Sequence, residues 1–117
     1  MSNIRIFDRK VYSGIPTNRI VEIRDIDNNT ISYCKYYLDY IGKNTIIVDI
    51  NTIVHYRNLG YASYILNYII RKSKRNYFKT ISLDDMSDRS NLDKNLYINN
   101  GFKYLEKGFP EMIYTIV

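Results

Sequence analysis

Residues 57–62, Arg-Asn-Leu-Gly-Tyr-Ala, have the types and order of a turn that could hold an anion at the start of a helix. Gly60 lets backbone approach a ligand closely because it has no Cβ. The first turn of a helix adds unpaired N–H groups and a positive dipole end. Ala62 is small enough to leave that approach open. This pattern predicts a phosphate or pyrophosphate site, although a single glycine turn of this kind is also common as a structural loop.

The residues after Gly60 must form the helix that positions this turn. Apolar side chains recur at helical spacing from Ala62 to Ile70, which predicts an amphipathic helix. Four cations follow within residues 71–75 and fall mainly on other faces. Cations suit the negative end of a helix dipole, so we interpret them as a solvated face rather than as a phosphate clamp.

Short runs rich in Ile, Val and Tyr predict strands on both sides of that helix. Before it, we expect strands at residues 3–7, 19–25, 30–40 and 45–52, with turns at 27–29 and 41–44. After it, we expect a strand at 79–83, a helix that begins at Ser90 and ends before Asn100, and strands at 102–105 and 112–117. The strands that flank the first helix should run parallel through a crossover. The prediction is a single α+β domain over residues 1–117, with an antiparallel N-terminal meander and a mixed sheet.

A second motif, residues 96–102 with the sequence Leu-Tyr-Ile-Asn-Asn-Gly-Phe, follows the first in the same order as in a known family. The turn at 57–62 resembles the Arg/Gln-x-x-Gly-x-Gly/Ala signature of the GNAT N-acetyltransferase superfamily, and the second motif resembles its Leu-Tyr-x-x-x-Gly-Phe segment. The resemblance covers residues 45–117 well and the N-terminal strands only by their general pattern. It implies a GNAT-like fold and an acetyl-CoA-dependent N-acetyltransferase.

The resemblance also implies roles for individual residues. Tyr97 would be the general acid that protonates the departing CoA thiolate, a role that suits a phenolic hydroxyl placed beside sulfur. Its alternative is an aromatic core position with the hydroxyl at the surface. Acetyl-CoA would be the co-substrate, and the residues assigned to it are Thr52 and Val54 for the pantetheine arm, Arg57, Asn58, Leu59, Gly60, Tyr61 and Ala62 for the pyrophosphate, and Ser90 and Asn91 at the second helix.

The acceptor side departs from the family pattern. Members usually have one or two helices between the first two strands, whereas this chain has only residues 8–18 there, interrupted by Gly14 and Pro16. We therefore expect either an open groove that accepts a protein or peptide amine, or a site completed by a second subunit in a homodimer. Asp84 and Asp85 follow a strand, and we assign them to binding the cationic amine, because acidic side chains there would attract it.

The general base is harder to place. The strand position that carries Glu in some family members falls near Ile46, and strict alternation predicts that Asp49 points to the other face. The remaining candidates are His55, Glu22 and the two aspartates at the end of the fifth strand. A relative that has lost catalysis and acts as a CoA-binding or protein-interaction module is the alternative to an enzyme.

Charge and composition bear on which other partners and cofactors are expected. The formal net charge of +5 favours an anionic partner, which could be nucleic acid, a membrane surface or a polyphosphate cofactor, and charge alone does not choose among them. Nucleic acid is the less favoured partner, because Lys72, Lys74, Arg75 and Lys79 gather at one helix end instead of alternating with aromatic residues. One Cys and one His are too few for a zinc site, so no metal is expected. The absence of a long apolar run predicts a cytoplasmic protein without a membrane partner.

Overall fold

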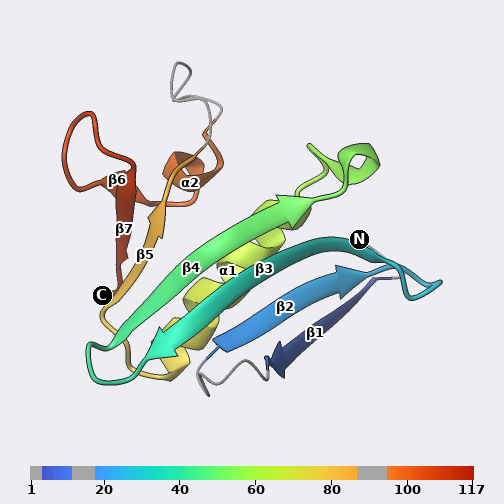
Figure 1. The fold of residues 1–117 in the computed structure, drawn as a ribbon, viewed down its shortest axis with the longest axis horizontal. Helices are drawn as coiled ribbons and strands as arrows, with labels where there is room; N and C mark the ends of the chain where they lie inside the picture. Colours follow the sequence, from blue (N-terminus) through green and yellow to red (C-terminus); the bar gives the residue numbers. More distant parts are fainter. Residues whose placement is uncertain (1–3, 12–17, 87–94) are drawn as a thin grey trace.

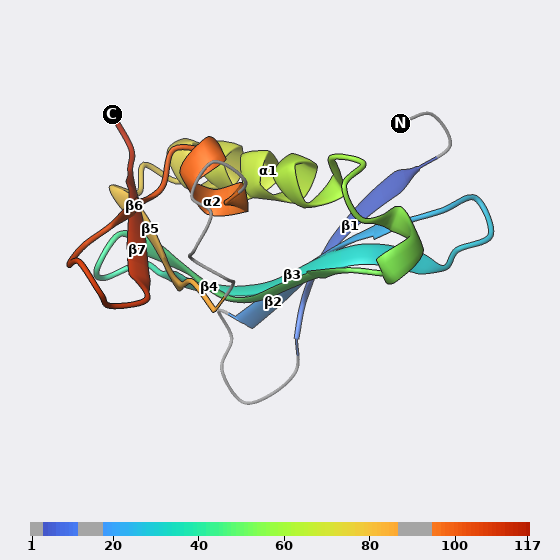
Figure 2. The ribbon, with the colours of Figure 1, turned by 90° about the horizontal axis from the view of Figure 1, so that it is seen from above.

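A computed structural model describes residues 4–11, 18–86 and 95–117, which form a mixed seven-stranded sheet with a long helix packed on one face (Figure 1, Figure 2). The strands are β1 (Arg5–Lys10), β2 (Asn18–Arg24), β3 (Thr30–Asp39), β4 (Asn44–Thr52), β5 (Thr80–Asp84), β6 (Lys103–Tyr104) and β7 (Glu111–Thr115). The helices are η1 (Val54–Tyr56), α1 (Tyr61–Arg75) and α2 (Leu96–Asn99). The spatial order of the strands is β1-β2-β3-β4-β5-β7-β6. Among the described helices, none has the length and apolar character needed to cross a membrane.

Strands β1 to β4 form the predicted antiparallel meander. Polar side chains close its turns: the Asp25 carboxylate accepts hydrogen bonds from the N–H groups of Asp27 and Asn29, and Asp39 accepts one from Gly42. Such Asx turns compete with strand pairing and therefore end strands. The predicted turns at 27–29 and 41–44 are confirmed by these contacts.

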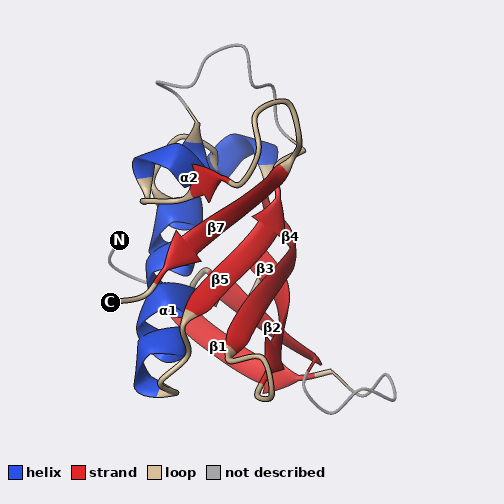
Figure 3. Ribbon diagram, turned by 90° about the vertical axis from the view of Figure 1, so that its left-hand side faces the viewer, coloured by secondary structure: helices blue, strands red, loops and turns tan. Residues whose placement is uncertain are grey.

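The two halves of the sheet meet at the parallel pair β4–β5, which the α1 crossover connects (Figure 3). Pairing joins residues Asn44, Thr45 and Ile46 of β4 to residues 80–82 of β5 and then stops. Because β4 continues to Thr52, its last six residues have no strand partner on the β5 side among the residues that the structure describes. Figure 1 shows the two strands diverging there. This divergence, called the gap below, creates an opening within the sheet.

Helix α1 covers the sheet with the apolar stripe that its spacing predicts. Ile65, Leu66 and Ile69 are at most 1% exposed and pack in one cluster with Val21 and Ile81 of the sheet. Burial of such side chains stabilises the fold by about 1.5–3 kcal/mol each. The helix therefore holds both halves of the sheet across the gap.

Asp8 ties the edge strand β1 to this helix. Its Oδ2 accepts hydrogen bonds from the hydroxyls of Tyr36 and Tyr68 at 2.7 and 2.6 Å and from the Lys72 ammonium at 2.7 Å, while Arg19 Nε donates to Oδ1 at 3.0 Å. These five residues are called the Asp8 cluster below. The prediction that the first strand ends at residue 7 was wrong, because strand pairing continues past Asp8 to Lys10.

The second helix is shorter in the described residues than the sequence predicts. Helix α2 begins at Leu96, and the side chain of Asn95 caps it by accepting hydrogen bonds from the N–H groups of Tyr97 and Ile98 at 2.9 and 3.0 Å. An asparagine at this position satisfies N–H groups that the helix itself leaves unpaired. The predicted start at Ser90 lies outside the described residues.

Candidate active site

The predicted anion-binding turn follows β4 and the short helix η1 and leads into α1. Asn58 and Gly60 adopt left-handed backbone conformations, with φ of 62° and 89°, which asparagine and glycine tolerate best. Gly60 is the N-cap of α1, and the first helical hydrogen bond runs from the Tyr64 N–H to its carbonyl. The N–H groups of Tyr61, Ala62 and Ser63 therefore precede the helical ladder, as an anion site requires.

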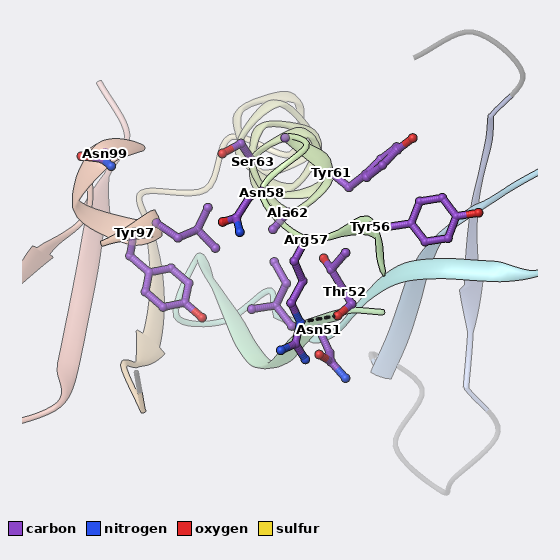
Figure 4. Close-up of a pocket in the computed structure, with 13 residues that line it drawn as sticks. Asn51, Thr52, Tyr56, Arg57, Asn58, Tyr61, Ala62, Ser63, Tyr97 and Asn99 are labelled. Atoms are coloured by element: carbon purple, nitrogen blue, oxygen red, sulfur yellow. Dashed lines mark hydrogen bonds between the residues drawn. The ribbon is translucent and has the colours of Figure 1, made fainter. Parts of the chain in front are cut away.

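Arg57 fastens this turn to the end of β4. Its Nε donates a 2.9 Å hydrogen bond to the Thr52 carbonyl, drawn as the dashed line in Figure 4. The Thr52 hydroxyl is in turn 2.8 Å from the Ser32 hydroxyl on β3. The strand end and the helix start are thus held as one unit, because the Arg57 side chain joins the turn to the backbone of β4.

A pocket of about 630 Å³, called the large pocket, lies between this turn, the end of β4 and α2 (Figure 4). Most of the predicted cofactor residues line it: Thr52, Arg57, Asn58, Gly60, Tyr61 and Ala62, together with the predicted acid Tyr97. Val54 and Leu59 are exposed and do not line it. Ser90 and Asn91 lie outside the described residues. The structure adds lining residues to which the sequence analysis assigned no role in the site: Ile50, Asn51, Tyr56, Ser63, Leu96 and Asn99.

Tyr97 projects from α2 toward the end of β4, with its hydroxyl in the space between the two (Figure 4). Its ring packs edge-to-face against Phe102, with centroids 6.2 Å apart. Burial, reinforced by the negative charge of Asp85, raises the pKa of Tyr97 to about 12. The hydroxyl therefore keeps its proton throughout the physiological pH range and is able to donate it.

A second hollow of about 250 Å³, called the small pocket, also lies at the gap. It shares Ile50 and Tyr97 with the large pocket. The carboxylates of Asp49 and Asp84 belong to its lining, on β4 and β5 respectively. Tyr97 therefore lies where the large pocket, at the start of α1, meets the small pocket, which contains Asp49 and Asp84.

The position of Asp49 corrects the alternation argument. A bulge shifts the register between β3 and β4, so that Tyr36 pairs with Ile47 but Lys35 pairs with Asp49. Val48 is thus an extra residue, and it returns Asp49 to the face that Ile46 occupies. The prediction that Asp49 points to the opposite face was wrong. The Tyr33 hydroxyl donates to the Asp49 carboxylate at 3.2 Å.

The structure separates the adjacent aspartates at the end of β5. Asp84 is exposed and lines the small pocket, whereas Asp85 is only 2% exposed. The Asp85 carboxylate accepts hydrogen bonds from the Asn95 side-chain amide, at 2.8 Å, and from the Tyr104 hydroxyl. Asp85 therefore holds the residue that caps α2, and through it the backbone of Tyr97.

The other two base candidates lie away from both pockets. His55 is exposed in η1, and Glu22 on β2 pairs with Arg24 at 2.6 Å. Neither lines the large or the small pocket. Within the described residues, His, Cys, Asp and Glu side chains form no group of three or more that could hold a metal ion.

Comparison with known proteins supports this geometry through fold alone. No protein-family model and no curated protein matches the sequence. Among solved structures, a GNAT family acetyltransferase from Elizabethkingia anophelis with acetyl-CoA bound matches with a TM-score of 0.72 at 17% identity, over 99% of this chain and 100% of that one. The IAA acetyltransferase from Bacillus cereus matches with a TM-score of 0.73 at 10% identity, over 97% and 99% of the two chains.

A third match has coenzyme A in its structure. The PaiA N-acetyltransferase from Thermoplasma acidophilum in complex with coenzyme A matches with a TM-score of 0.70 at 12% identity, over 86% of this chain and 62% of that one. The matches span nearly the whole chain, so they include the N-terminal meander that the sequence motifs left undecided. The strand order, the gap and these matches together show that the chain has the fold of the GNAT acetyltransferases.

Proposed function

We propose that this protein transfers an acetyl group from acetyl-CoA to a primary amine. The observation that carries the proposal is the position of Tyr97, which lines both pockets at the point where β4 and β5 separate. A donor in the large pocket and an acceptor in the small pocket would meet beside its hydroxyl. The motif at 57–62 and the GNAT fold support the same assignment.

The residues of the large pocket fit acetyl-CoA. The N–H groups of Tyr61, Ala62 and Ser63 would hold the pyrophosphate, because they lie before the first hydrogen bond of α1. The unpaired edge of β4, ending at Thr52, would offer backbone groups to the pantetheine arm, with Val54 beyond it. When bound, acetyl-CoA would supply the activated thioester.

The residues at the gap would move two protons during the reaction. The carboxylates of Asp49 and Asp84 would attract a cationic amine, and Asp49 would take up the proton that the ammonium group must lose before attack. Attack of the amine on the thioester carbonyl forms the C–N bond, and the C–S bond breaks. The Tyr97 hydroxyl, protonated because its pKa is about 12, would give its proton to the sulfur, and the second proton lost by the attacking nitrogen as the amide forms would restore the phenol. Asp49 would then release its proton to solvent.

A negative charge introduced at the start of α1 tests whether CoA binds there. We expect Ala62→Glu to weaken CoA binding by tenfold or more, because opposite charges at about 4 Å interact by roughly 1–4 kcal/mol and like charges repel as strongly. A carboxylate in the first helical turn favours the helix, so the fold should persist. Isothermal titration calorimetry with CoA and acetyl-CoA measures the change.

Tyr64→Glu is the matched control, since it places the same charge in the same helical turn but outside the large pocket. It should bind CoA within about threefold of the unmodified protein. Equal binding by both variants, or no CoA binding by the unmodified protein, would contradict the proposed site. CoA binding without turnover of any amine in a panel of small amines and lysine peptides would support a CoA-binding module instead.

Asp49 is the test of the acceptor side. We expect Asp49→Asn to lower kcat/KM for a cationic amine by about tenfold, the effect of losing roughly 1.4 kcal/mol of interaction with the ammonium group and its proton. The Kd for acetyl-CoA should stay unchanged. Asp27→Asn, an exposed carboxylate in the β2–β3 turn, is the control for net charge. If both variants lower kcat/KM equally, Asp49 has no specific role.

A further inference from the structure

The end of the molecule opposite to the gap carries an exposed surface of its own. The β3–β4 turn and the loop from α1 to β5 both lie at this end (Figure 1, Figure 3). The Lys79 N–H donates a 2.8 Å hydrogen bond to the Lys43 carbonyl, which holds the two segments side by side. We call this surface the basic end, and its exposed residues are Tyr40, Ile41, Lys43, Lys74, Arg75, Tyr77 and Lys79.

Three large side chains of the basic end project into solvent. Ile41 is 99% exposed at the tip of the β3–β4 turn, Tyr77 is 86% exposed and Tyr40 is 57% exposed. The Tyr40 ring packs edge-to-face on buried Phe78, with centroids 5.4 Å apart, so its orientation is set by the core. Single exposed apolar residues are ordinary, but three gathered at one tip form a surface that favours an apolar contact.

Two residues of this surface adopt backbone conformations that do not suit their side chains. Lys43 has φ of 52° and Tyr77 has φ of 59°, both in the left-handed region. Tyr77 follows the C-cap of α1, and its N–H donates to the Lys74 carbonyl. Glycine or asparagine is the usual residue at such a position. The strain is thus carried by a lysine and a tyrosine whose side chains gain little from packing, because both are exposed.

The charge of the basic end is strongly one-sided. Over residues 39–43 and 74–79 the cations are Lys43, Lys74, Arg75 and Lys79, and the acidic side chain is Asp39. The Asp39 carboxylate accepts the Gly42 N–H within its own turn. The nearby Lys72 is excluded from this surface because it pairs with Asp8 at 2.7 Å. The four exposed cations would therefore attract an anionic surface.

We propose that the basic end docks on an anionic lipid surface, with Ile41, Tyr40 and Tyr77 in the headgroup region and the four cations on the phosphates. Tyrosine favours the boundary between headgroups and acyl chains, and basic residues add attraction to anionic lipids. A fully exposed isoleucine at the tip favours lipid over single-stranded nucleic acid, which stacks on aromatic rings. The expectation of no membrane partner rested on the absence of a membrane-crossing segment, whereas this proposal concerns contact at the membrane surface.

Vesicle sedimentation tests the proposal. We expect binding to vesicles of phosphatidylcholine with phosphatidylserine, no binding to phosphatidylcholine alone, and weaker binding at high salt. Lys74→Gln and Arg75→Gln should each lower the binding constant about fivefold. Ile41→Ser should lower it about threefold without changing charge. Lys107→Gln is the matched control, because Lys107 is an exposed cation in the β6–β7 loop, outside the basic end.

Tyr77→Gly separates a docking role from a structural one. Glycine relieves the left-handed backbone, so the unfolding temperature should rise while vesicle binding falls. A fall in both would mean that Tyr77 serves the fold and would overturn its part in docking. Absence of binding to anionic vesicles at low salt, an unchanged constant for Ile41→Ser, or equal losses for Lys107→Gln and Lys74→Gln would overturn the proposal. Binding of a single-stranded oligonucleotide without vesicle binding would overturn it as well.

Discussion

Replacing Tyr97 by phenylalanine should lower kcat for acetyl transfer by about a hundredfold to a thousandfold, while the Kd for acetyl-CoA stays the same. Proton donation by a positioned side chain contributes a factor of this size. The ring contact with Phe102 remains in the variant, because only the hydroxyl is removed. Steady-state kinetics with the best amine acceptor, combined with calorimetry, measures both quantities.

Tyr114→Phe is the control, since Tyr114 also packs on Phe102 but lines neither pocket. It should retain full activity. Because the pKa of Tyr97 is about 12, its deprotonation should not lower kcat anywhere in the neutral range. Unchanged kcat in Tyr97→Phe would remove the acid role, and a parallel loss of stability and cofactor affinity would indicate a packing role instead.

Replacing Asp8 by asparagine should lower the free energy of unfolding by about 3 kcal/mol. Loss of the carboxylate leaves Arg19 and Lys72 as partly buried cations without their partner, and breaking a fully buried pair costs roughly 3–5 kcal/mol. We take the lower part of that range because both cations are 18% exposed. For a domain of ordinary stability this is a large fraction of the total. Urea unfolding followed by circular dichroism measures it.

The same cluster should make stability fall at low pH. Burial alone raises the pKa of Asp8, but hydrogen bonds from Lys72, Tyr68 and Tyr36 outweigh it, so the pKa lies below the ordinary value of 3.8. A carboxylate with a depressed folded pKa contributes stability above its unfolded pKa. That contribution is lost as the pH falls below about 3.8 and through the folded pKa. The contribution of Asp8 to this dependence should be absent in Asp8→Asn, which should therefore lose less stability on acidification.

Two further variants keep this prediction testable. Tyr68→Phe removes one donor from the cluster and should cost about 1 kcal/mol, so it remains measurable if Asp8→Asn fails to fold. Asp27→Asn removes an exposed carboxylate and should change stability by less than about 0.5 kcal/mol. An Asp8→Asn protein as stable as Asp27→Asn would contradict the role of the cluster.

Local sequence signals predicted the parts of the site that lie close together in the chain. Gly60 and Ala62 mark a turn whose conformation depends on neighbouring residues, and Tyr97 belongs to a short motif of the same kind. The bulge at Val48 depends on how β4 pairs with β3, which no residue of β4 reveals alone. The place of Ser63 in the pocket lining could have been predicted, because it follows Ala62 in the same helical turn.

Contacts between residues far apart in the chain could not be predicted from the sequence. Asp84 and Asp85 are identical in type and adjacent, and only their contacts tell the exposed carboxylate from the buried one. The Asp8 cluster joins Asp8 to Tyr36, Tyr68 and Lys72 across as many as 64 positions. Nothing in a single sequence pairs residues at such separations, whereas helical and strand periodicity is visible within a few residues.

The incomplete pairing of β4 with β5 makes the sheet mechanically uneven. The meander is connected to the unit of β5, β7 and β6 by three residue pairs, by hydrogen bonds of Lys43 and Asn44 to residues 79–82 and by the packing of α1. We therefore expect the two units to separate locally at a lower free energy than that of global unfolding. A molecule in the gap touches both units and supplies part of the cohesion that strand pairing omits. We therefore expect occupancy of the gap to slow amide hydrogen exchange in β5 and β7.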